Sequence, residues 1–291
     1  MPEQVPWGFL VLDKPAGLTS HDCVGLVRRA YGLRRVGHGG TLDPAVTGVL
    51  PIALGSATRL LPYLNGPKAY RGVVRLGLRT STDDLEGEVL EQRGAPSLDR
   101  ASLEQALSSF RGEILQQPPQ VSAVHVGGVR AYQRSRRGEI VALDPRPVTI
   151  HQLELLRWDP AQGELELLVR CSAGTYLRAL ARDLGEMLGC GGALAWLRRT
   201  EALGFMLAQA VPPESLPQPL LDPLSALGHL PRQQLQLDEW DGWRCGRAFP
   251  ASFSLDPGTP VAVLSPQGRL AGIAHASHDR LQPKLVLDAA G

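Results

Sequence analysis

The chain alternates short apolar runs with segments in which apolar residues recur at helical spacing. Continuous or alternating apolar runs predict strands, and helical spacing predicts amphipathic helices. Predicted strands cover residues 8–15, 49–54, 68–80, 147–158, 164–174 and 192–205. Predicted helices cover residues 19–32, 56–64, 98–110 and 175–189. The elements follow no strict β–α–β rhythm, which favours an α+β fold with a mixed, largely antiparallel central sheet and flanking helices.

Two of the predicted helices carry local signals at their ends. Thr19 or Ser20 can cap the first helix, and Gly32 can end it. Asp99 or Ser102 stands near the start of the helix over 98–110. These signals predict helix boundaries close to the limits given above.

Two segments interrupt the pattern. Residues 116–147 mix prolines, glycines and arginines, which predicts a mobile surface insertion. Residues 211–232 contain six prolines and separate off a C-terminal piece. The short apolar runs TPVAVL, RLAGIA and LQPKLVL predict that residues 231–291 form a small all-β module. Residues 1–230 then form the main domain.

Composition fits a soluble globular protein, with 43% hydrophobic and 20% charged residues and a net charge of only +1. The positive excess lies in residues 1–150, which carry 18 Lys and Arg against 14 Asp and Glu. Such arginine clusters are usually solvated, and become candidate phosphate contacts only when other features point to nucleic acid. The two clusters are Arg28, Arg29, Arg34 and Arg35, and Arg130, Arg134, Arg136 and Arg137.

Cysteine and histidine spacing gives no indication of a metal site. No CxxC pair occurs among Cys23, Cys171, Cys190 and Cys245, so we expect reduced thiols in a cytoplasmic protein. His275 and His278 are three residues apart but have no third ligand nearby. The apolar run GFLVL is too short for a signal peptide, and no segment approaches the ~20 apolar residues of a membrane span.

The segment VGHGGTLDPAVTGVL, residues 36–50, places one aspartate, Asp43, before a proline in a glycine-rich stretch. It lacks both the Lys-Ser/Thr ending of a P-loop and the GxGxxG spacing of a dinucleotide fold. Glycines can supply positive φ in a turn that Asp43 caps locally. Alternatively, Asp43 is a catalytic carboxylate on a stiff loop, where glycines let a bulky ligand come close. A catalytic carboxylate would need an arginine partner to hold it ionised and aimed.

Four segments, in order, resemble the bacterial tRNA pseudouridine-55 synthase family of B-type pseudouridine synthases. They are GFLVLDKPAGLTSHDCVGLVRR, VGHGGTLDPAVTGVLPIALGSATRL, KAYRGVVRLGLRTSTDDLEGEV and CSAGTYLRALARDLGEMLGCGGALAWLRRT, from about residue 8 to 205. The resemblance implies the pseudouridine synthase fold. It also implies conversion of uridine 55 in the T arm of tRNA to its C-glycoside isomer, without cofactor or metal. In the family a small PUA-type domain occupies the place of residues 231–291.

The resemblance implies roles for individual residues. Asp43 matches the family's nucleophile, and Arg178 matches the arginine that pairs with it. Tyr70 matches the tyrosine that stacks on the flipped-out base and serves in proton transfer. Whether Asp43 attacks the base or the ribose stays open. Residues matching substrate contacts are His38, Arg59, Asp84, Tyr176 and Leu197. The 116–147 insertion matches the one that grips the T arm, so its arginines become candidate RNA contacts: Arg130, Arg134, Arg136 and Arg137.

The chain departs from the family pattern at a few positions. Arg59 stands where lysine is usual, and Gly39 replaces a commoner threonine. Val121 replaces a usual aromatic residue, and His125 a usual lysine. These changes concern substrate contacts and leave the residues matching the nucleophile, the stacking tyrosine and the arginine in place.

Three other functions compete with this interpretation. A non-catalytic RNA-binding or RNA-folding protein could use the same cleft. A glycoside hydrolase would need a second carboxylate, which Asp83 or Asp84 could supply. A guide-RNA-dependent relative would work with protein partners and usually carries longer terminal extensions. The intact trio of Asp43, Tyr70 and Arg178 favours a stand-alone tRNA enzyme, and we expect a monomer because no coiled coil or long apolar edge is visible.

Overall fold

The computed structural model describes residues 6–94, 97–121, 125–126, 129–130 and 143–287. Within these residues a nine-stranded sheet forms the centre of the molecule. Its main path runs β1 (Gly8–Lys14), β3 (Thr47–Leu54), β12 (Gly192–Ala202), β4 (Lys68–Leu76), β11 (Glu164–Cys171), β10 (Arg146–Asp159) and β7 (Gly112–Gln116). Strand β2 (Val36–His38) pairs with β3, and β13 (Phe205–Met206) with β12. Only β3 and β12 pair in parallel among the described strands of this sheet, so the predicted mixed, largely antiparallel sheet is confirmed.

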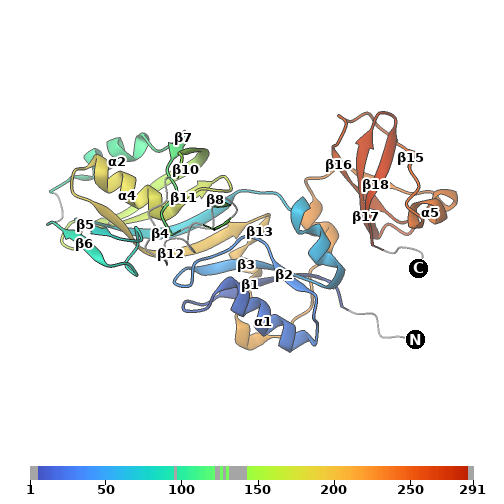
Figure 1. The fold of residues 1–291 in the computed structure, drawn as a ribbon, viewed down its shortest axis with the longest axis horizontal. Coiled ribbons are helices and arrows are strands. Elements are labelled where there is room, and N and C mark those ends of the chain that lie inside the picture. The colour runs from blue at the N-terminus through green and yellow to red at the C-terminus, as the bar shows by residue number, and fades with distance from the viewer. Residues whose placement is uncertain (1–5, 95–96, 122–124, 127–128, 131–142, 288–291) are drawn as a thin grey trace.

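Among the described residues, three α-helices flank this sheet, and the starts of two of them follow the sequence signals. Helix α1 (Ser20–Tyr31) begins after Thr19, which forms a capping box with Asp22, and ends at Gly32 in the left-handed conformation. Helix α2 (Arg100–Ser108) begins after Asp99, whose side chain accepts from the Ser102 amide. Helix α4 (Leu177–Met187) lies beside α2 on one side of the sheet, and α1 lies below β1, β2 and β3 in Figure 1.

Apolar stripes fix these helices to the sheet. Leu180 and Leu184 of α4 are buried in one core cluster with Leu103 and Leu107 of α2. In α1, Val24 and Val27 belong to a second cluster, formed with residues of β1 and β3. Each fully buried leucine contributes about 1.5–3 kcal/mol relative to exposure. The packing of α4 therefore fixes its first turn, which carries Arg178, against the sheet.

A separate five-stranded sheet forms the C-terminal part, at the right of Figure 1. Its order is β14 (Arg232–Gln234), β16 (Pro260–Leu264), β17 (Leu270–Ser277), β18 (Arg280–Val286) and β15 (Phe249–Pro250). The prediction of an all-β module is wrong in one respect, because helix α5 (Leu237–Arg244) buries Trp243 in this core. Ala262 and Ile273 share a further apolar cluster with Phe9 and Leu60, so the two sheets are packed together through it.

Three other features of the large-sheet part differ from the sequence prediction. The strand predicted over 68–80 is broken at Gly77, where φ is +82°, and β5 (Leu78–Thr80) pairs instead with β6 (Val89–Gln92). The segment 56–64 forms the 3₁₀ helix η1 (Gly55–Tyr63), with Pro62 inside it. The glycine-rich segment contains β2, which the sequence did not predict.

The proline-rich segment 211–232 is not a free linker. Val211 and Leu221 exchange backbone hydrogen bonds with Val11, Asp13 and Phe9 of β1. Between and around them lie the short 3₁₀ turns η2 (Leu207–Gln209), η3 (Pro213–Ser215) and η4 (Pro223–Leu227). The segment thus covers β1 on its way to the C-terminal sheet.

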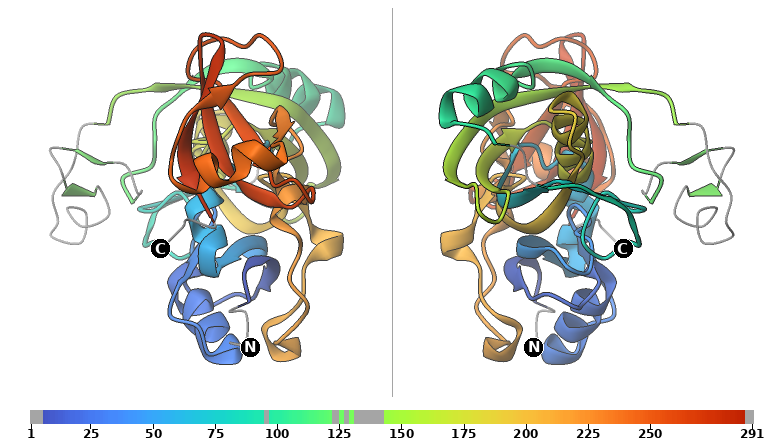
Figure 2. Two further views of the ribbon diagram at one scale, coloured as in Figure 1. Left: turned by 90° about the vertical axis from the view of Figure 1, so that its right-hand side faces the viewer. Right: turned by 90° about the vertical axis from the view of Figure 1, so that its left-hand side faces the viewer.

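The predicted insertion 116–147 begins and ends at one edge of the large sheet. Gln116, the last residue of β7, pairs there with Arg146, the first residue of β10. Its described part includes the paired strands β8 (His125–Val126) and β9 (Val129–Arg130), which stand apart from the body in Figure 2. Arg130 lies in β9. The predicted RNA contacts Arg134, Arg136 and Arg137 lie outside the described residues, and the predicted mobility of the insertion stays a prediction.

Candidate active site

Asp43 lies on a turn that is fixed on both sides. Leu42 before it and Val46 after it are buried, whereas the Asp43 side chain is 49% exposed. The Leu42 amide donates to Ser20 Oγ at 2.9 Å, and the Ser20 hydroxyl donates to the Leu42 carbonyl at 3.2 Å. The Val46 amide donates to the Asp43 carbonyl at 3.1 Å. The carboxylate is therefore presented to solvent from a well-anchored backbone.

Lys14 holds the second half of this turn. It is fully buried at the end of β1, and its Nζ donates to the carbonyls of Pro44 at 2.9 Å and Val46 at 2.8 Å. Burial lowers the pKa of Lys14, and nearby Cys23 and Asp43 oppose that shift. Carbonyl oxygens satisfy the buried ammonium, so Lys14 links the turn firmly to the sheet.

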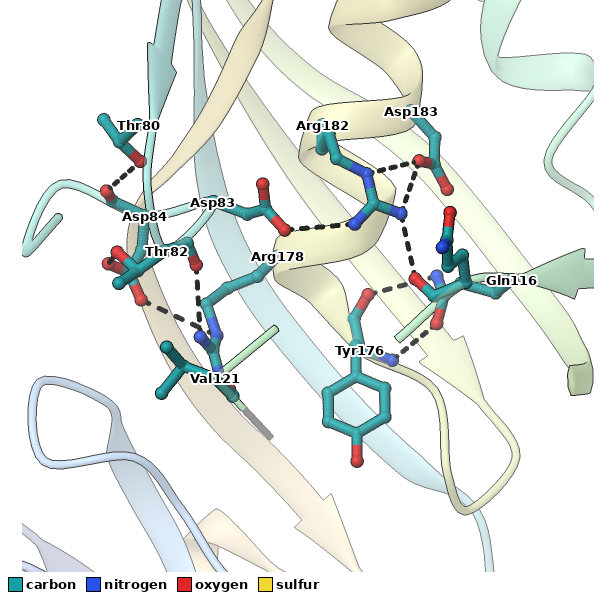
Figure 3. A network of polar contacts seen from close by, with 11 residues as sticks. Thr80, Thr82, Asp83, Asp84, Gln116, Val121, Tyr176, Arg178, Arg182 and Asp183 are labelled. Atoms are coloured by element: carbon teal, nitrogen blue, oxygen red, sulfur yellow. Dashed lines mark hydrogen bonds and ion pairs between the residues drawn. The ribbon is translucent and has the colours of Figure 1, made fainter. Parts of the chain in front are cut away.

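Arg178, on the first turn of α4, is aimed at Asp43. Its Nη2 lies 2.9 Å from Asp43 Oδ2, and its Nε lies 3.6 Å from Asp84 Oδ2. The guanidinium also donates to the carbonyls of Thr82 at 3.1 Å and Val121 at 2.9 Å, as Figure 3 shows. With its side chain only 8% exposed, Arg178 is held in one orientation by these contacts. The predicted pairing of Asp43 with Arg178 is thus present in the geometry.

The adjacent acids Asp83 and Asp84 point to different partners (Figure 3). Asp84 accepts from Thr82 Oγ1 at 2.5 Å and from the Glu86 amide at 3.1 Å, and it shares Arg178 with Asp43. Asp83 has a left-handed backbone and pairs with Arg182 at 3.1 Å. Burial raises the pKa of Asp83, opposed by the Arg182 charge. Asp84, rather than Asp83, therefore belongs to the group around Asp43.

A cavity opens between these groups. Its lining includes Asp43, Val46, Asp84, Arg178, Leu194, Trp196 and Leu197. The predicted contact Leu197 thus forms part of its wall. A larger hollow lies beside Arg182, Asp183 and Glu186, and neither Asp43 nor Arg178 lines it. The small cavity is therefore the one that contains the predicted pair of Asp43 and Arg178, and its walls include apolar side chains.

Tyr70 lies on β4, in the same core cluster as Leu42, Val46 and Leu197. It is only 6% exposed, so its ring is largely packed within the protein. Burial raises the pKa of Tyr70 to about 12, although the Arg199 charge opposes the shift. At neutral pH Tyr70 is therefore a neutral phenol that can donate a hydrogen bond. Its stacking on a base stays a prediction.

The other predicted substrate contacts differ in their surroundings. Tyr176 is the N-cap residue of α4, tied to Gln116 through its backbone, and its ring points away from Arg182 in Figure 3. His38 on β2 is half-buried, and burial lowers its pKa. Its Nδ1 is buried without a hydrogen-bond partner among the described atoms. The structure does not bring Arg59 to the cavity: its guanidinium donates to the Val286 carbonyl of β18 at 2.9 Å.

Sequence reasoning missed several side chains that shape the site. Lys14 and Ser20 hold the turn that carries Asp43, and Thr82 donates a hydrogen bond to Asp84. Arg199, fully buried on β12, donates to the Gly40 carbonyl at 3.0 Å. Lys14 has a signal that could have found it, since it is a cation in a strand that is otherwise almost wholly apolar and buried.

No set of three His, Cys, Asp or Glu side chains is grouped for metal binding in the part of the chain that the structure describes. Over the same residues, no helix has the length and apolar character needed to span a membrane.

Comparisons with known proteins agree with one another. Residues 28–177 match the family model described as TruB family pseudouridylate synthase (N terminal domain). The chain is 63% identical to "tRNA pseudouridine synthase B" of Parasynechococcus marenigrum, covering 98% of this chain and 99% of that protein. It is 50% identical to the protein of the same name from Prochlorococcus marinus strain MIT 9313, with 99% of both covered.

Solved structures extend the similarity to the fold. An H/ACA ribonucleoprotein bound to a substrate RNA containing 2′-deoxyuridine contains a chain that superimposes with a TM-score of 0.75 at 22% identity. The alignment covers 97% of this chain and 85% of that one. With the family match and the high identity to full-length relatives, these findings show that the chain belongs to the TruB family of pseudouridylate synthases.

Proposed function

We propose that the chain converts uridine 55 in the T arm of tRNA to pseudouridine, with Asp43 as the nucleophile. The observation that carries this proposal is the ion pair of 2.9 Å between Asp43 and the buried Arg178, at the mouth of a cavity with apolar walls. The names of the relatives support tRNA as the substrate. The position of the uridine rests on the family resemblance of the four segments.

The reaction is an isomerisation. The bond from C1′ of ribose to N1 of uracil breaks, the base turns, and C1′ bonds to C5. C5 then loses its hydrogen and N1 carries one, so no oxidant or reductant is needed. A covalent bond to Asp43 divides this change into two easier steps. Whether that bond forms at the ribose or at the base is left open by this proposal.

Each residue near the cavity has a task in this scheme. Arg178 aims the Asp43 carboxylate through the ion pair and hydrogen bonds that fix the guanidinium. Asp84 balances the charge of Arg178. Leu197 provides apolar surface for the extruded base, whose removal from the RNA stack costs a few kcal/mol. Tyr70, as a neutral phenol, donates a proton or hydrogen bond to the base.

Further RNA contacts lie around the cavity. We assign His38 and Tyr176 to the nucleotides next to the target, and Arg59 to the RNA backbone near the C-terminal sheet. The insertion arginines Arg130, Arg134, Arg136 and Arg137 would bind T-arm phosphates. Their replacement by alanine should reduce the slope of log affinity against log salt by about 0.7–0.9 for each lost phosphate contact.

The proposal also divides the chain into three parts. Residues 1–230 form the synthase domain, 116–147 its RNA-contacting insertion, and 231–291 a PUA-like module. The enzyme acts in the cytoplasm as a monomer, without guide RNA or protein partner. The 63% identity to a protein named as a tRNA enzyme favours this over the H/ACA ribonucleoprotein, whose chain is only 22% identical.

The test is position-resolved pseudouridine formation in unmodified T-arm hairpins. One hairpin carries its only uridine at position 55, and a matched hairpin carries cytidine there and uridines at the other loop positions. We expect conversion of the first hairpin and none of the second. Conversion of the second would place the target elsewhere. Tight binding of both without conversion would instead favour the RNA-binding interpretation.

A further inference from the structure

Arg199 is a buried cation at the centre of the large sheet. It lies on β12 and is 0% exposed. Its backbone is fixed by parallel pairing with Gly48 of β3, where an added Cβ would lie 2.1 Å from the Arg199 carbonyl oxygen. Gly48 has φ of +102°, so glycine permits both the backbone conformation and this close approach. The position of Arg199 beneath the Asp43 loop is therefore determined by the sheet.

The Arg199 guanidinium donates hydrogen bonds to backbone carbonyls of the loop that leads to Asp43. Nη2 donates to the Gly40 carbonyl at 3.0 Å, and Nη1 lies 3.4 Å from the Thr41 carbonyl. Nε donates to the Val49 carbonyl at 2.8 Å, on the strand that follows the loop. Arg199 thus joins the residues before and after Asp43, while Lys14 holds the turn itself.

Tyr70 of β4 lies directly opposite Arg199 in the pairing of β12 with β4, and its hydroxyl is within hydrogen-bonding reach of the same guanidinium. A guanidinium can only donate, so Tyr70 Oη is the acceptor in this contact and keeps its own hydrogen for another acceptor. Asp43 is one of the charges that act on Tyr70. Arg199 therefore contacts Tyr70 directly and reaches Asp43 through the loop that carries it.

The contacts of Arg199 are unusual for a charge buried this deeply. Among the described residues, no carboxylate lies within ion-pair distance of it; carbonyls and a phenol are its partners. A buried charge without an opposite charge is costly, and an apolar side chain would fill a purely structural position with less penalty. The retained guanidinium needs an explanation beyond packing.

We propose that Arg199 is a positioning residue, which couples the Asp43 loop to Tyr70 and holds both in the geometry of the reaction. This inference rests on the proposed function of the site. Misplacement of a reacting group by about 1 Å can cost on the order of 100-fold in rate. Loss of Arg199 should therefore reduce the chemical step and leave RNA affinity nearly unchanged.

The test compares Arg199→Met and Arg199→Lys with Arg198→Lys as the matched control. Arg198 is the next residue on β12, half-exposed, and pairs with Asp13 at 2.6 Å. With saturating T-arm hairpin, the Met variant should lose about 100-fold in single-turnover rate and the Lys variant about 10-fold. The dissociation constant for the hairpin should stay within threefold in both. The control should stay within twofold of wild type in rate.

A second readout separates positioning from general stability. In protein labelled with ¹³Cζ tyrosine, the Tyr70 resonance is identified by its loss in Tyr70→Phe. We expect this resonance to shift in both Arg199 variants and not in Arg198→Lys. In the Tyr70→Phe background, Arg199→Met should cause a smaller fold-loss in rate than in the wild-type background, because part of its effect passes through Tyr70.

Wild-type rate in a folded Arg199→Met variant would overturn the inference, as would an unchanged Tyr70 resonance. So would a loss confined to RNA affinity. If the Met variant does not fold, the rate, affinity and Tyr70 resonance of the Lys variant test the inference by the same criteria. Failure of both variants to fold would assign Arg199 to sheet stability and overturn the inference. A wild-type chain that converts no hairpin would contradict the proposed function instead, and the Tyr70 resonance would still test the contact with Arg199.

Discussion

The two sheets of the molecule bury different kinds of side chain. Among the described residues, the buried charged side chains are Lys14, Arg178 and Arg199, and all three belong to the large-sheet part. The C-terminal sheet buries residues such as Trp243 and Ile273. Its buried polar side chains, Gln233 and Ser265, are neutral. The two parts therefore differ in what their interiors contain.

This difference supports the proposed location of the reaction in the large-sheet part. Burying a cation costs several kcal/mol unless hydrogen bonds or an opposite charge offset it. All three cations contact the short stretch from Gly40 to Val46, through its carbonyls or through Asp43. The C-terminal sheet has no such group in the described residues and relies on apolar packing. Substitutions in the first part should therefore change reaction rate, and those in the second should change stability.

Replacing Asp43 with Asn should have the largest effect. The change keeps the shape of the side chain and removes the charge and the proposed nucleophile, so the rate should fall by about four orders of magnitude or more. Hairpin affinity should stay within a few fold. The matched control is Asp13→Asn, which removes a carboxylate paired with Arg198. A rate within tenfold of wild type for Asp43→Asn would remove Asp43 as the nucleophile.

Replacing Arg178 with Met should come next. The Asp43 carboxylate would lose its charge partner and its aim, and we expect a loss of about 100- to 1,000-fold in single-turnover rate. Arg182→Met is the control, because Arg182 lies one turn later on α4 and pairs with Asp83. Equal losses in the two variants would show that the helix, and not the pair with Asp43, carries the effect.

The opposite behaviour is expected of Trp243→Ala in the C-terminal core. Removing this fully buried side chain should lower the free energy of unfolding by about 3–5 kcal/mol, as measured by urea denaturation. Under conditions where the variant is folded, its single-turnover rate with saturating RNA should stay within twofold of wild type. A tenfold loss of rate there would break the proposed division between the two sheets.

The smallest expected effect concerns Tyr70 and is a loss of folding stability in alkaline solution. Its folded pKa of about 12 lies above the ordinary value of 10.0, so the folded state keeps the proton that the unfolded state releases. The resulting stability is complete below pH 10 and is lost as pH rises through about 12. Between pH 8 and 11.5, wild type should lose on the order of 2 kcal/mol more than Tyr70→Phe. Parallel urea-denaturation curves for the two proteins would contradict the burial of the Tyr70 hydroxyl.

The sequence predicted the parts of the fold and site that depend on local pattern. Thr19 and Gly32 bound α1 as expected, because capping is decided within a few residues. The pairing of Asp43 with Arg178 followed from the family resemblance and is present in the geometry. The break at Gly77 was missed, since apolar alternation continues across it while the backbone turns.

Contacts between distant segments could not be predicted. Arg199 lies more than 150 residues from Gly40 and Thr41, and nothing local indicates which carbonyls it reaches. Arg59 donates to Val286 on a strand whose packing depends on the whole C-terminal sheet. Trp243 lies on a short helix of eight residues, whose burial depends on the sheet beneath it rather than on periodicity.

The most direct test of the account is a crystal structure of the Asp43→Asn variant bound to a T-arm hairpin. We predict uridine 55 out of the RNA stack, with its base in the cavity lined by residue 43, Arg178 and Leu197 and close to Tyr70. A uridine that stays stacked in the loop, or a base bound in the larger hollow beside Arg182, would contradict the assignment of this cavity as the active site.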